Sequence, residues 1–125
     1  MKVLVVDDEK DIELLFRQRF RKEIRDGEME LVFAYSGEEA LNYLGQLEHE
    51  AVPILSDINM PGMSGLELLR QIKQKFEEPT PVVMMITAYG DEDNYNRAIQ
   101  LGADDFLTKP LDFNLLKEKL KERMQ

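Results

Sequence analysis

The sequence lacks cysteine, contains no tryptophan and has a single histidine in 125 residues. Without cysteine there is no disulfide scaffold, no zinc ribbon and no thiol nucleophile. Long apolar runs are also missing, and the longest, such as residues 81–86, are far too short to cross a bilayer. The chain leads from Lys2 straight into a short apolar run and two aspartates, which is unlike a secretory signal. These absences predict a soluble, cytoplasmic protein that does not enter the membrane.

Positive charge is scarce relative to negative charge. The chain has 16 lysine and arginine residues against 25 aspartate and glutamate residues, a formal net charge of -9. An acidic surface repels phosphate backbones, so nucleic-acid binding by this segment is not expected. A chain of 125 residues has the usual size of one domain and can bury a core of its own. We therefore expect one domain over residues 1–125.

What the chain does contain is a regular alternation of two patterns. Short β-branched or apolar runs predict strands at residues 2–6, 29–34, 52–56, 82–86 and, more weakly, 105–108. A segment with helical spacing follows each run, which makes five predicted helices. This order favours a parallel sheet covered by helices on both faces, and right-handed crossovers make a doubly wound sheet the simplest architecture.

Local signals place the ends of these helices. The first has apolar residues at four-residue steps from Ile12 to Ile24. The second and third open with Ser36 and Ser64, each followed three residues later by glutamate, the spacing of a capping box. The fourth is expected to stop at Gly102. The fifth is expected to begin at Asp112, with an apolar stripe at its residues 113, 116, 120 and 124.

Polar residues gather where the predicted strands end. Asp7 and Asp8 follow the first strand, Asp57 the third, Thr87 the fourth and Lys109 the fifth. Each alone would be an ordinary turn, cap or loop residue. In an open parallel sheet, however, the carboxyl ends of the strands meet at one edge, where ligands bind. The shared location therefore indicates one functional site.

The chemistry that suits this set is phosphoryl transfer to a carboxylate. Three crowded carboxylates repel one another, and a hard divalent cation such as Mg²⁺, with Mn²⁺ as an alternative, relieves the repulsion. Asp57 is ionised near neutral pH and needs no general base to act as a nucleophile. Lys109 can neutralise charge on the transferred group, and Thr87 can donate a hydrogen bond to it.

Four segments carry a resemblance to a known family. They read VVDDE at residues 5–9, DINMPGMSG at 57–65, TA at 87–88 and GADDFLTKP at 102–110. Together they span the chain and resemble the receiver domain of bacterial two-component response regulators. The resemblance implies a flavodoxin-like α/β fold, a doubly wound five-stranded parallel sheet of order 2-1-3-4-5 with five helices.

The resemblance also implies roles for individual residues. Asp57 would take a phosphoryl group from a sensor histidine kinase or a histidine phosphotransfer protein. The metal ligands would be Asp7, Asp8, Asp57 and the backbone carbonyl of Asn59. Thr87 and Lys109 would contact the phosphoryl group, and the bond between Lys109 and Pro110 would be cis.

A switch is implied as well. Movement of Thr87 would let Phe106 turn inward and would reshape the surface of the fourth helix, fifth strand and fifth helix. That surface would act on a downstream protein or a C-terminal effector domain, or would form a dimer on phosphorylation. The resemblance further implies that Asn59 and Tyr89 occupy positions that tune the rate of dephosphorylation in the family. Ser56, where the family more often has a bulky apolar residue, predicts looser packing before the nucleophile.

Three other interpretations compete with this one. A flavodoxin-like cofactor binder needs a hydroxyl- and glycine-rich phosphate loop after the first strand, where this chain is acidic. A haloacid-dehalogenase-type phosphatase needs a second aspartate at position 9, where Glu9 stands. A receiver-shaped interaction module that works without phosphorylation stays open. No enzymatic activity is expected beyond the protein's own phosphorylation and dephosphorylation.

Overall fold

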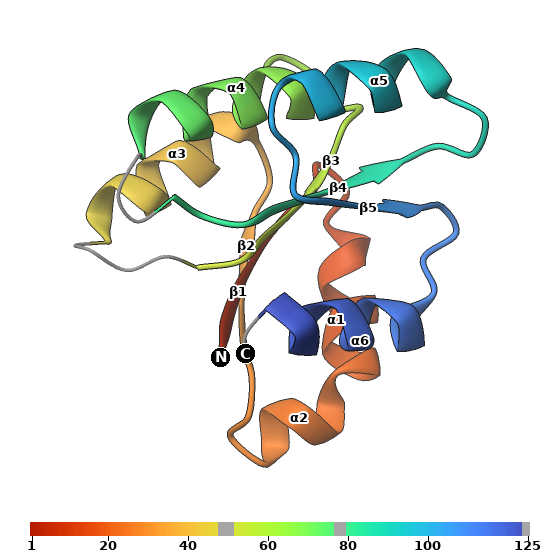
Figure 1. Ribbon diagram of the computed structural model, residues 1–125. Coiled ribbons are helices and arrows are strands. Elements are labelled where there is room, and N and C mark those ends of the chain that lie inside the picture. The colour runs from red at the N-terminus through yellow and green to blue at the C-terminus, as the bar shows by residue number, and fades with distance from the viewer. Residues whose placement is uncertain (48–51, 77–79, 124–125) are drawn as a thin grey trace.

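The computed structural model describes residues 1–47, 52–76 and 80–123. Strands and helices alternate along this part of the chain (Figure 1). The strands are β1 (Lys2–Val6), β2 (Glu30–Ala34), β3 (Ile54–Asp57), β4 (Val83–Thr87) and β5 (Asp105–Thr108). The helices are α1 (Asp11–Arg19), α2 (Arg21–Arg25), α3 (Gly37–Gln46), α4 (Gly65–Lys75), α5 (Glu92–Gln100) and α6 (Phe113–Arg123). No helix in the described ranges is long and apolar enough to span a bilayer.

The five strands form one parallel sheet in the order β2-β1-β3-β4-β5. The predicted strand order and flavodoxin-like architecture are thereby confirmed. Each strand lies within two residues of its predicted limits. The order of the strands reverses at β1, which pairs with β2 on one side and with β3 on the other.

The number of helices differs from the prediction of five, because the first predicted helix is divided. Phe20 separates α1 from α2, with backbone angles of φ -103° and ψ 17° that are not helical. Its ring is fully buried, stacked at 6.0 Å on Phe16 and 6.1 Å from the ring of Phe113. The hydrogen bonds from Phe20 N to Phe16 O and from Ile24 N to Phe20 O, both 2.9 Å, continue across the break. Packing of one aromatic ring therefore accompanies a local break that sequence periodicity does not reveal.

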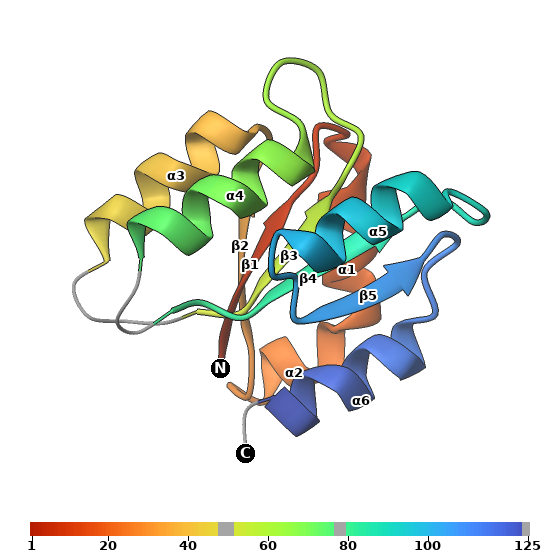
Figure 2. The same cartoon turned by 45° about the horizontal axis from the view of Figure 1, so that its top comes forward.

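The sheet separates two apolar clusters. In Figure 1 and Figure 2, α3, α4 and α5 cover one face, and α1, α2 and α6 cover the other. Neighbouring residues of a strand face opposite sides, so Ile54 belongs to the cluster under α3–α5 and Leu55 to the cluster under α1 and α6. The first cluster includes Leu69, and the second includes Phe16. The central strands are buried on both faces, as their continuous apolar sequences predict.

The predicted helix caps are present. Ser36 Oγ accepts a hydrogen bond from Glu39 N at 3.1 Å, and Ser64 Oγ accepts one from Glu67 N at 3.2 Å. Asp112 Oδ1 accepts from Leu115 N at 3.1 Å at the start of α6. Residue 102 has a φ of 95°, a conformation suited to glycine, just after α5. Of the predicted α6 stripe, residues 116 and 120 are buried, whereas residue 124 lies outside the described residues.

Candidate functional site

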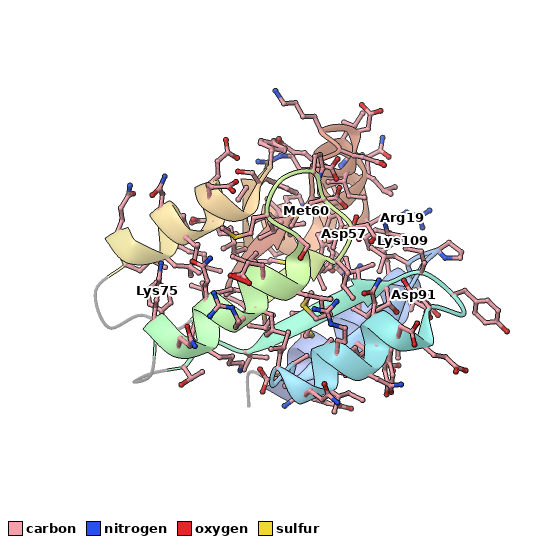
Figure 3. The ribbon with its side chains drawn as sticks, turned by 90° about the horizontal axis from the view of Figure 1, so that it is seen from above. Arg19, Asp57, Met60, Lys75, Asp91 and Lys109 are labelled. Carbon is pink, nitrogen blue, oxygen red and sulfur yellow. The ribbon has the colours of Figure 1, made fainter. Side chains whose placement is uncertain are left out.

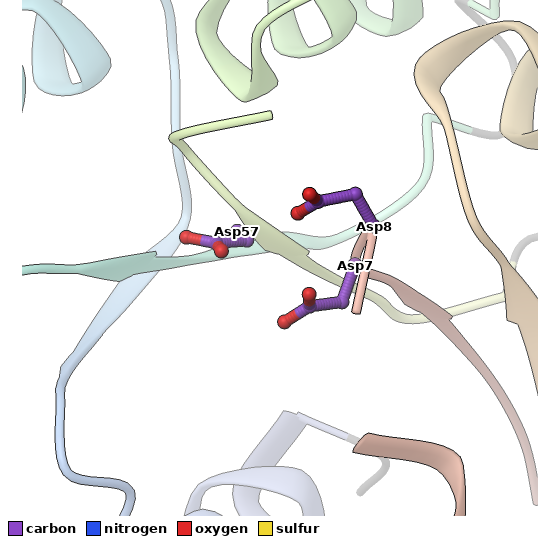
Figure 4. A group of neighbouring side chains, drawn as sticks. All are labelled: Asp7, Asp8 and Asp57. Carbon is purple, nitrogen blue, oxygen red and sulfur yellow. The ribbon is translucent and has the colours of Figure 1, made fainter. Parts of the chain in front are cut away.

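The register of the sheet brings the three predicted carboxylates together. Val6 pairs with Ser56 across β1 and β3, so the residues that follow them, Asp7 and Asp57, end neighbouring strands. One carboxylate oxygen from each of Asp7, Asp8 and Asp57 lies within 4.8 Å of the other two (Figure 4). Asp7 and Asp57 are only 5% and 4% exposed, and Asp8 is more open to solvent. The cluster is thus a half-buried concentration of negative charge.

Lys109 supplies a positive charge beside Asp57. Its ammonium donates a hydrogen bond to Asp57 Oδ2 at 2.9 Å, and the two side chains lie together in Figure 3. Its backbone N donates to Thr87 O, also at 2.9 Å, because β4 and β5 pair at Thr87 and Thr108. Thr87 itself is buried at the end of β4. The Lys109–Pro110 peptide bond is cis.

Negative charge exceeds positive charge at the acidic cluster, and this affects the pKa values of Asp7 and Lys109. Burial, and then the neighbouring charge of Asp57, raise the pKa of the Asp7 carboxyl above its ordinary value, although a hydrogen bond from Glu9 N opposes the rise. Burial lowers the pKa of the Lys109 ammonium, but the hydrogen bond and charge of Asp57 outweigh it and raise that pKa. Three carboxylates against one ammonium leave a formal excess of two negative charges when all are ionised.

This donor set fits a hard divalent cation. Carboxylate oxygens are the ligands that Mg²⁺, Mn²⁺ and Ca²⁺ prefer in proteins. Two of the three carboxylates are buried, and the formal excess of two negative charges matches the charge of such an ion. The acidic cluster can therefore bind a metal ion.

The backbone of Asp57 is held from two sides. The Ser56 hydroxyl donates a hydrogen bond to the Asp57 carbonyl oxygen at 3.0 Å, and Ser56 is only 1% exposed. The small Ser56 side chain is thus buried and hydrogen-bonded, and the looser packing expected there stays a prediction. On the other side, a Cβ added at Gly65 would lie 2.1 Å from the same carbonyl oxygen. The first turn of α4 thus lies directly against the backbone of Asp57, a contact that the sequence motif alone did not reveal.

The remaining predicted residues differ in how far they are exposed to solvent. Asn59 is exposed in the loop after β3, and Tyr89 is 89% exposed after β4. Phe106 is half-buried on β5, and its ring packs 4.4 Å from the ring of Tyr95 on α5. The sequence did not predict Tyr95 as a neighbour of Phe106, because their contact depends on how α5 packs against β5.

Comparison with known proteins identifies the family. A family model described as the response regulator receiver domain matches residues 3–121. This chain belongs to the response regulator receiver domain family. The flavodoxin-like cofactor binder and the phosphatase are accordingly set aside, and the receiver domain is assigned to two-component signalling.

Solved structures agree with this assignment. A response regulator receiver domain protein of Clostridium thermocellum is 29% identical, with a TM-score of 0.82 over 97% of this chain and 91% of that one. The chemotaxis response regulator CheY4 of Vibrio cholerae is 28% identical, with a TM-score of 0.77 over 97% and 96% of the two chains. The signal receiver domain of a signal transduction histidine kinase of Syntrophus aciditrophicus is 26% identical, with a TM-score of 0.81 over 97% and 87%.

Proposed function

We propose that residues 1–125 act as one receiver domain that accepts a phosphoryl group on Asp57 in a Mg²⁺-dependent reaction and thereby controls a partner. The observation that carries this proposal is the union of a metal-binding acidic cluster with a lysine bound to one of its carboxylates. A structural ion pair would need only one carboxylate, whereas here three converge on one end of the sheet.

Asp57 is the nucleophile in this scheme. One of its carboxylate oxygens attacks the phosphorus of a phosphohistidine on a sensor kinase or a histidine phosphotransfer protein. An O–P bond forms as the N–P bond breaks, and the electron pair of that bond stays on the departing imidazole. Ser56 and Gly65 fix the backbone of Asp57, so the side chain starts from a defined position.

Lys109 and Thr87 serve the transferred group. The Lys109 ammonium, 2.9 Å from Asp57 Oδ2, is placed to meet negative charge on the phosphoryl oxygens. Thr87 ends β4 beside it and offers a hydroxyl donor. The β4–β5 pairing and the hydrogen bond from Lys109 N to Thr87 O hold the backbones of both residues at this end of the sheet.

Mg²⁺, or Mn²⁺ in its place, would be held by Asp7, Asp8, Asp57 and the backbone carbonyl of Asn59. When bound, the cation neutralises charge on the carboxylates and on the phosphoryl oxygens. Glu9 N keeps the Asp7 carboxylate oriented through a 2.9 Å hydrogen bond. The only reactions assigned to this chain are its own phosphorylation and dephosphorylation, with Asn59 and Tyr89 affecting the access of water.

The output surface is formed by α5, β5 and α6. Once Thr87 bonds to the phosphoryl group, Phe106 would leave its contact with Tyr95 and turn inward, which changes the face that α5 presents. Phe106 has no hydroxyl, so no side-chain hydrogen bond opposes this movement. The partner is a downstream protein, a C-terminal effector domain or a second copy in a phosphorylation-dependent dimer. A cytoplasmic location is part of the same proposal.

The decisive experiment measures intact mass after incubation with MgCl₂ and acetyl phosphate. The wild type is expected to gain one phosphoryl group, and Asp57→Asn is expected to gain none. Asp26→Asn is a matched control, since this exposed carboxylate pairs with Arg25 at the end of α2 and is not part of the cluster. Chelation of Mg²⁺ should prevent the gain in mass.

The alternative, an interaction module that works without phosphorylation, makes the opposite forecast. It predicts no mass change with any donor. A phosphoryl group on the wild type and on Asp57→Asn alike would also refute the assignment, because the modification would then lie elsewhere.

A further inference from the structure

A hydrogen bond outside the acidic cluster joins α1 to the segment after β2. The Tyr35 hydroxyl, directly after β2, donates to Glu13 Oε1 in the first turn of α1. The two residues are 22 positions apart in sequence. The ammonium of Lys10 lies 5.6 Å from the centre of the Tyr35 ring, so three residues meet at this point.

Both partners of this bond are themselves held in place. Glu13 Oε2 accepts a second hydrogen bond from Arg17 Nε at 3.0 Å. The backbone N of Tyr35 donates to the carboxylate of Glu39, whose own backbone N is bonded to the Ser36 cap. The hydrogen bond from Tyr35 lowers the pKa of the Glu13 carboxyl, which is consistent with a bond that favours the charged acceptor.

The hydrogen bond from Tyr35 to Glu13 closes a ring of hydrogen-bonded contacts around the loop that carries Asp7 and Asp8. Asp7 N donates to Ala34 O at 3.1 Å, which attaches one end of the loop to β2. The other end enters α1, where Glu13 N donates to Lys10 O at 3.2 Å. Tyr35, the residue after Ala34, reaches back to Glu13 and completes the ring.

Asp8 is the member of the cluster that depends most on this ring. The Asp7 carboxylate is held by Glu9 N, and the Asp57 carboxylate is held by Lys109. Within the described part of the chain, the Asp8 carboxylate has no hydrogen bond of its own. Its position therefore follows the backbone of residues 8–10, which the ring encloses.

We propose that Tyr35 is a positioning residue for the metal site, acting through Glu13 to hold the Asp8-bearing loop in its metal-binding conformation. This inference rests on the proposed function. A net hydrogen bond of this kind corresponds to roughly a three- to tenfold change in an equilibrium constant. Tyr35→Phe should therefore weaken Mg²⁺ binding by about three- to tenfold and leave the phosphorylation rate at saturating Mg²⁺ unchanged.

The test combines two measurements on the whole chain. Isothermal titration with MgCl₂ gives the affinity, and intact mass with acetyl phosphate gives the rate at limiting and saturating Mg²⁺. Tyr43→Phe is the matched control, because Tyr43 lies on α3 and packs on the cluster under α3–α5. Amide hydrogen exchange in metal-free protein adds a readout without the ion, and Tyr35→Phe should speed exchange at Glu9, whose N–H donates to Asp7 Oδ1.

Substitutions of Glu13 separate positioning from general stability. Glu13→Ala should match Tyr35→Phe, and the double variant should lose no more affinity than either single variant. Glu13→Gln keeps an oxygen that accepts the hydroxyl and should stay within about twofold of the wild type. Urea unfolding of each variant shows whether the chain is still folded.

Two results would overturn the inference. One is an unchanged Mg²⁺ affinity in folded Tyr35→Phe, and the other is a rate that falls equally at limiting and saturating Mg²⁺. If the wild type binds Mg²⁺ and is phosphorylated, either result removes only the role of Tyr35. If the wild type does neither, the proposed function fails together with this inference.

Discussion

Replacing Asp7 by Asn should stabilise the metal-free protein. The substitution removes one charge from a cluster whose oxygens lie within 4.8 Å, while its side-chain oxygen can still accept the 2.9 Å hydrogen bond from Glu9 N. At that separation each pair of charges repels by about 1 kcal/mol in water and by roughly 3–4 kcal/mol at an effective dielectric constant of 20. Loss of the attraction to Lys109 offsets part of the gain. We expect a net gain of about 1–2 kcal/mol in the free energy of unfolding at pH 7.

In the presence of Mg²⁺, the wild type should be more stable than Asp7→Asn. A ligand at 100 times its dissociation constant stabilises the folded state by about 2.7 kcal/mol. The wild type should receive this gain, whereas Asp7→Asn would lack one of the proposed ligands of the ion. Urea unfolding followed by far-ultraviolet circular dichroism, in EDTA and in MgCl₂, measures both effects. A lower stability of Asp7→Asn in EDTA, compared with wild type and with the control Asp26→Asn, would refute the reasoning.

The advantage of Asp7→Asn should depend on pH in a defined direction. The folded-state pKa of Asp7 is raised above its ordinary value of 3.8. Below that value the carboxyl is protonated in both states, so Asp7 brings no charge penalty there. As pH rises through the ordinary value toward the raised pKa, the unfolded state loses its proton first and the wild type loses stability. The difference between the two proteins should therefore be absent near pH 3 and complete once pH exceeds the folded-state pKa of Asp7.

Further predictions concern the nucleophile and its surroundings. Lys109→Met should slow phosphorylation at saturating Mg²⁺ by at least about tenfold without weakening Mg²⁺ binding, as mass and calorimetry would show; an unchanged rate would contradict its role. Gly65→Ala should lower the free energy of unfolding, measured in urea, by about 1–3 kcal/mol, because the new Cβ would lie 2.1 Å from Asp57 O. Gly45→Ala is the control: Gly45 lies in α3 and an added Cβ would meet no atom within 4 Å, so this change should raise the free energy of unfolding by about 0.5–1 kcal/mol. Tyr89→Glu should lose its phosphoryl group faster than the wild type, because the proposed role of the exposed Tyr89 ring is to obstruct the attacking water; equal or slower loss of mass would argue against that role.

The strands could be predicted closely because burial on both faces leaves a strong pattern. Residues 83–87 read VMMIT and are all buried, so hardly any other structure suits them. The starts of α3 and α4 could also be predicted, since a serine followed by glutamate three positions later is a local signal. The division between α1 and α2 at Phe20 could not be predicted, because the four-residue spacing of apolar residues runs through it unbroken. The break coincides with packing of the Phe20 ring against Phe113.

The same distinction applies to the site. Asp7, Asp57, Thr87 and Lys109 could be grouped from the sequence because all of them end parallel strands, which must meet at one edge. The bond between Tyr35 and Glu13 could not, because it depends on how α1 is oriented over the sheet. Nor could the close approach of Gly65 to Asp57, which is set by the path of the loop between them.

The separation of the interior into two clusters has a consequence for how changes combine. Phe16 belongs to the cluster under α1 and α6, and Leu69 to the cluster under α3–α5, with the sheet between them. Destabilising substitutions at sites without shared neighbours add within about 0.5 kcal/mol, so Phe16→Leu and Leu69→Ala should do so in unfolding experiments; a larger coupling would show that the sheet transmits packing strain. When the changes in unfolding free energy add, the residues packed on one face of the sheet can be changed without regard to those on the other face. The helices on one side of the sheet can therefore diverge, or be redesigned for a new partner, while those on the other side keep their original sequence.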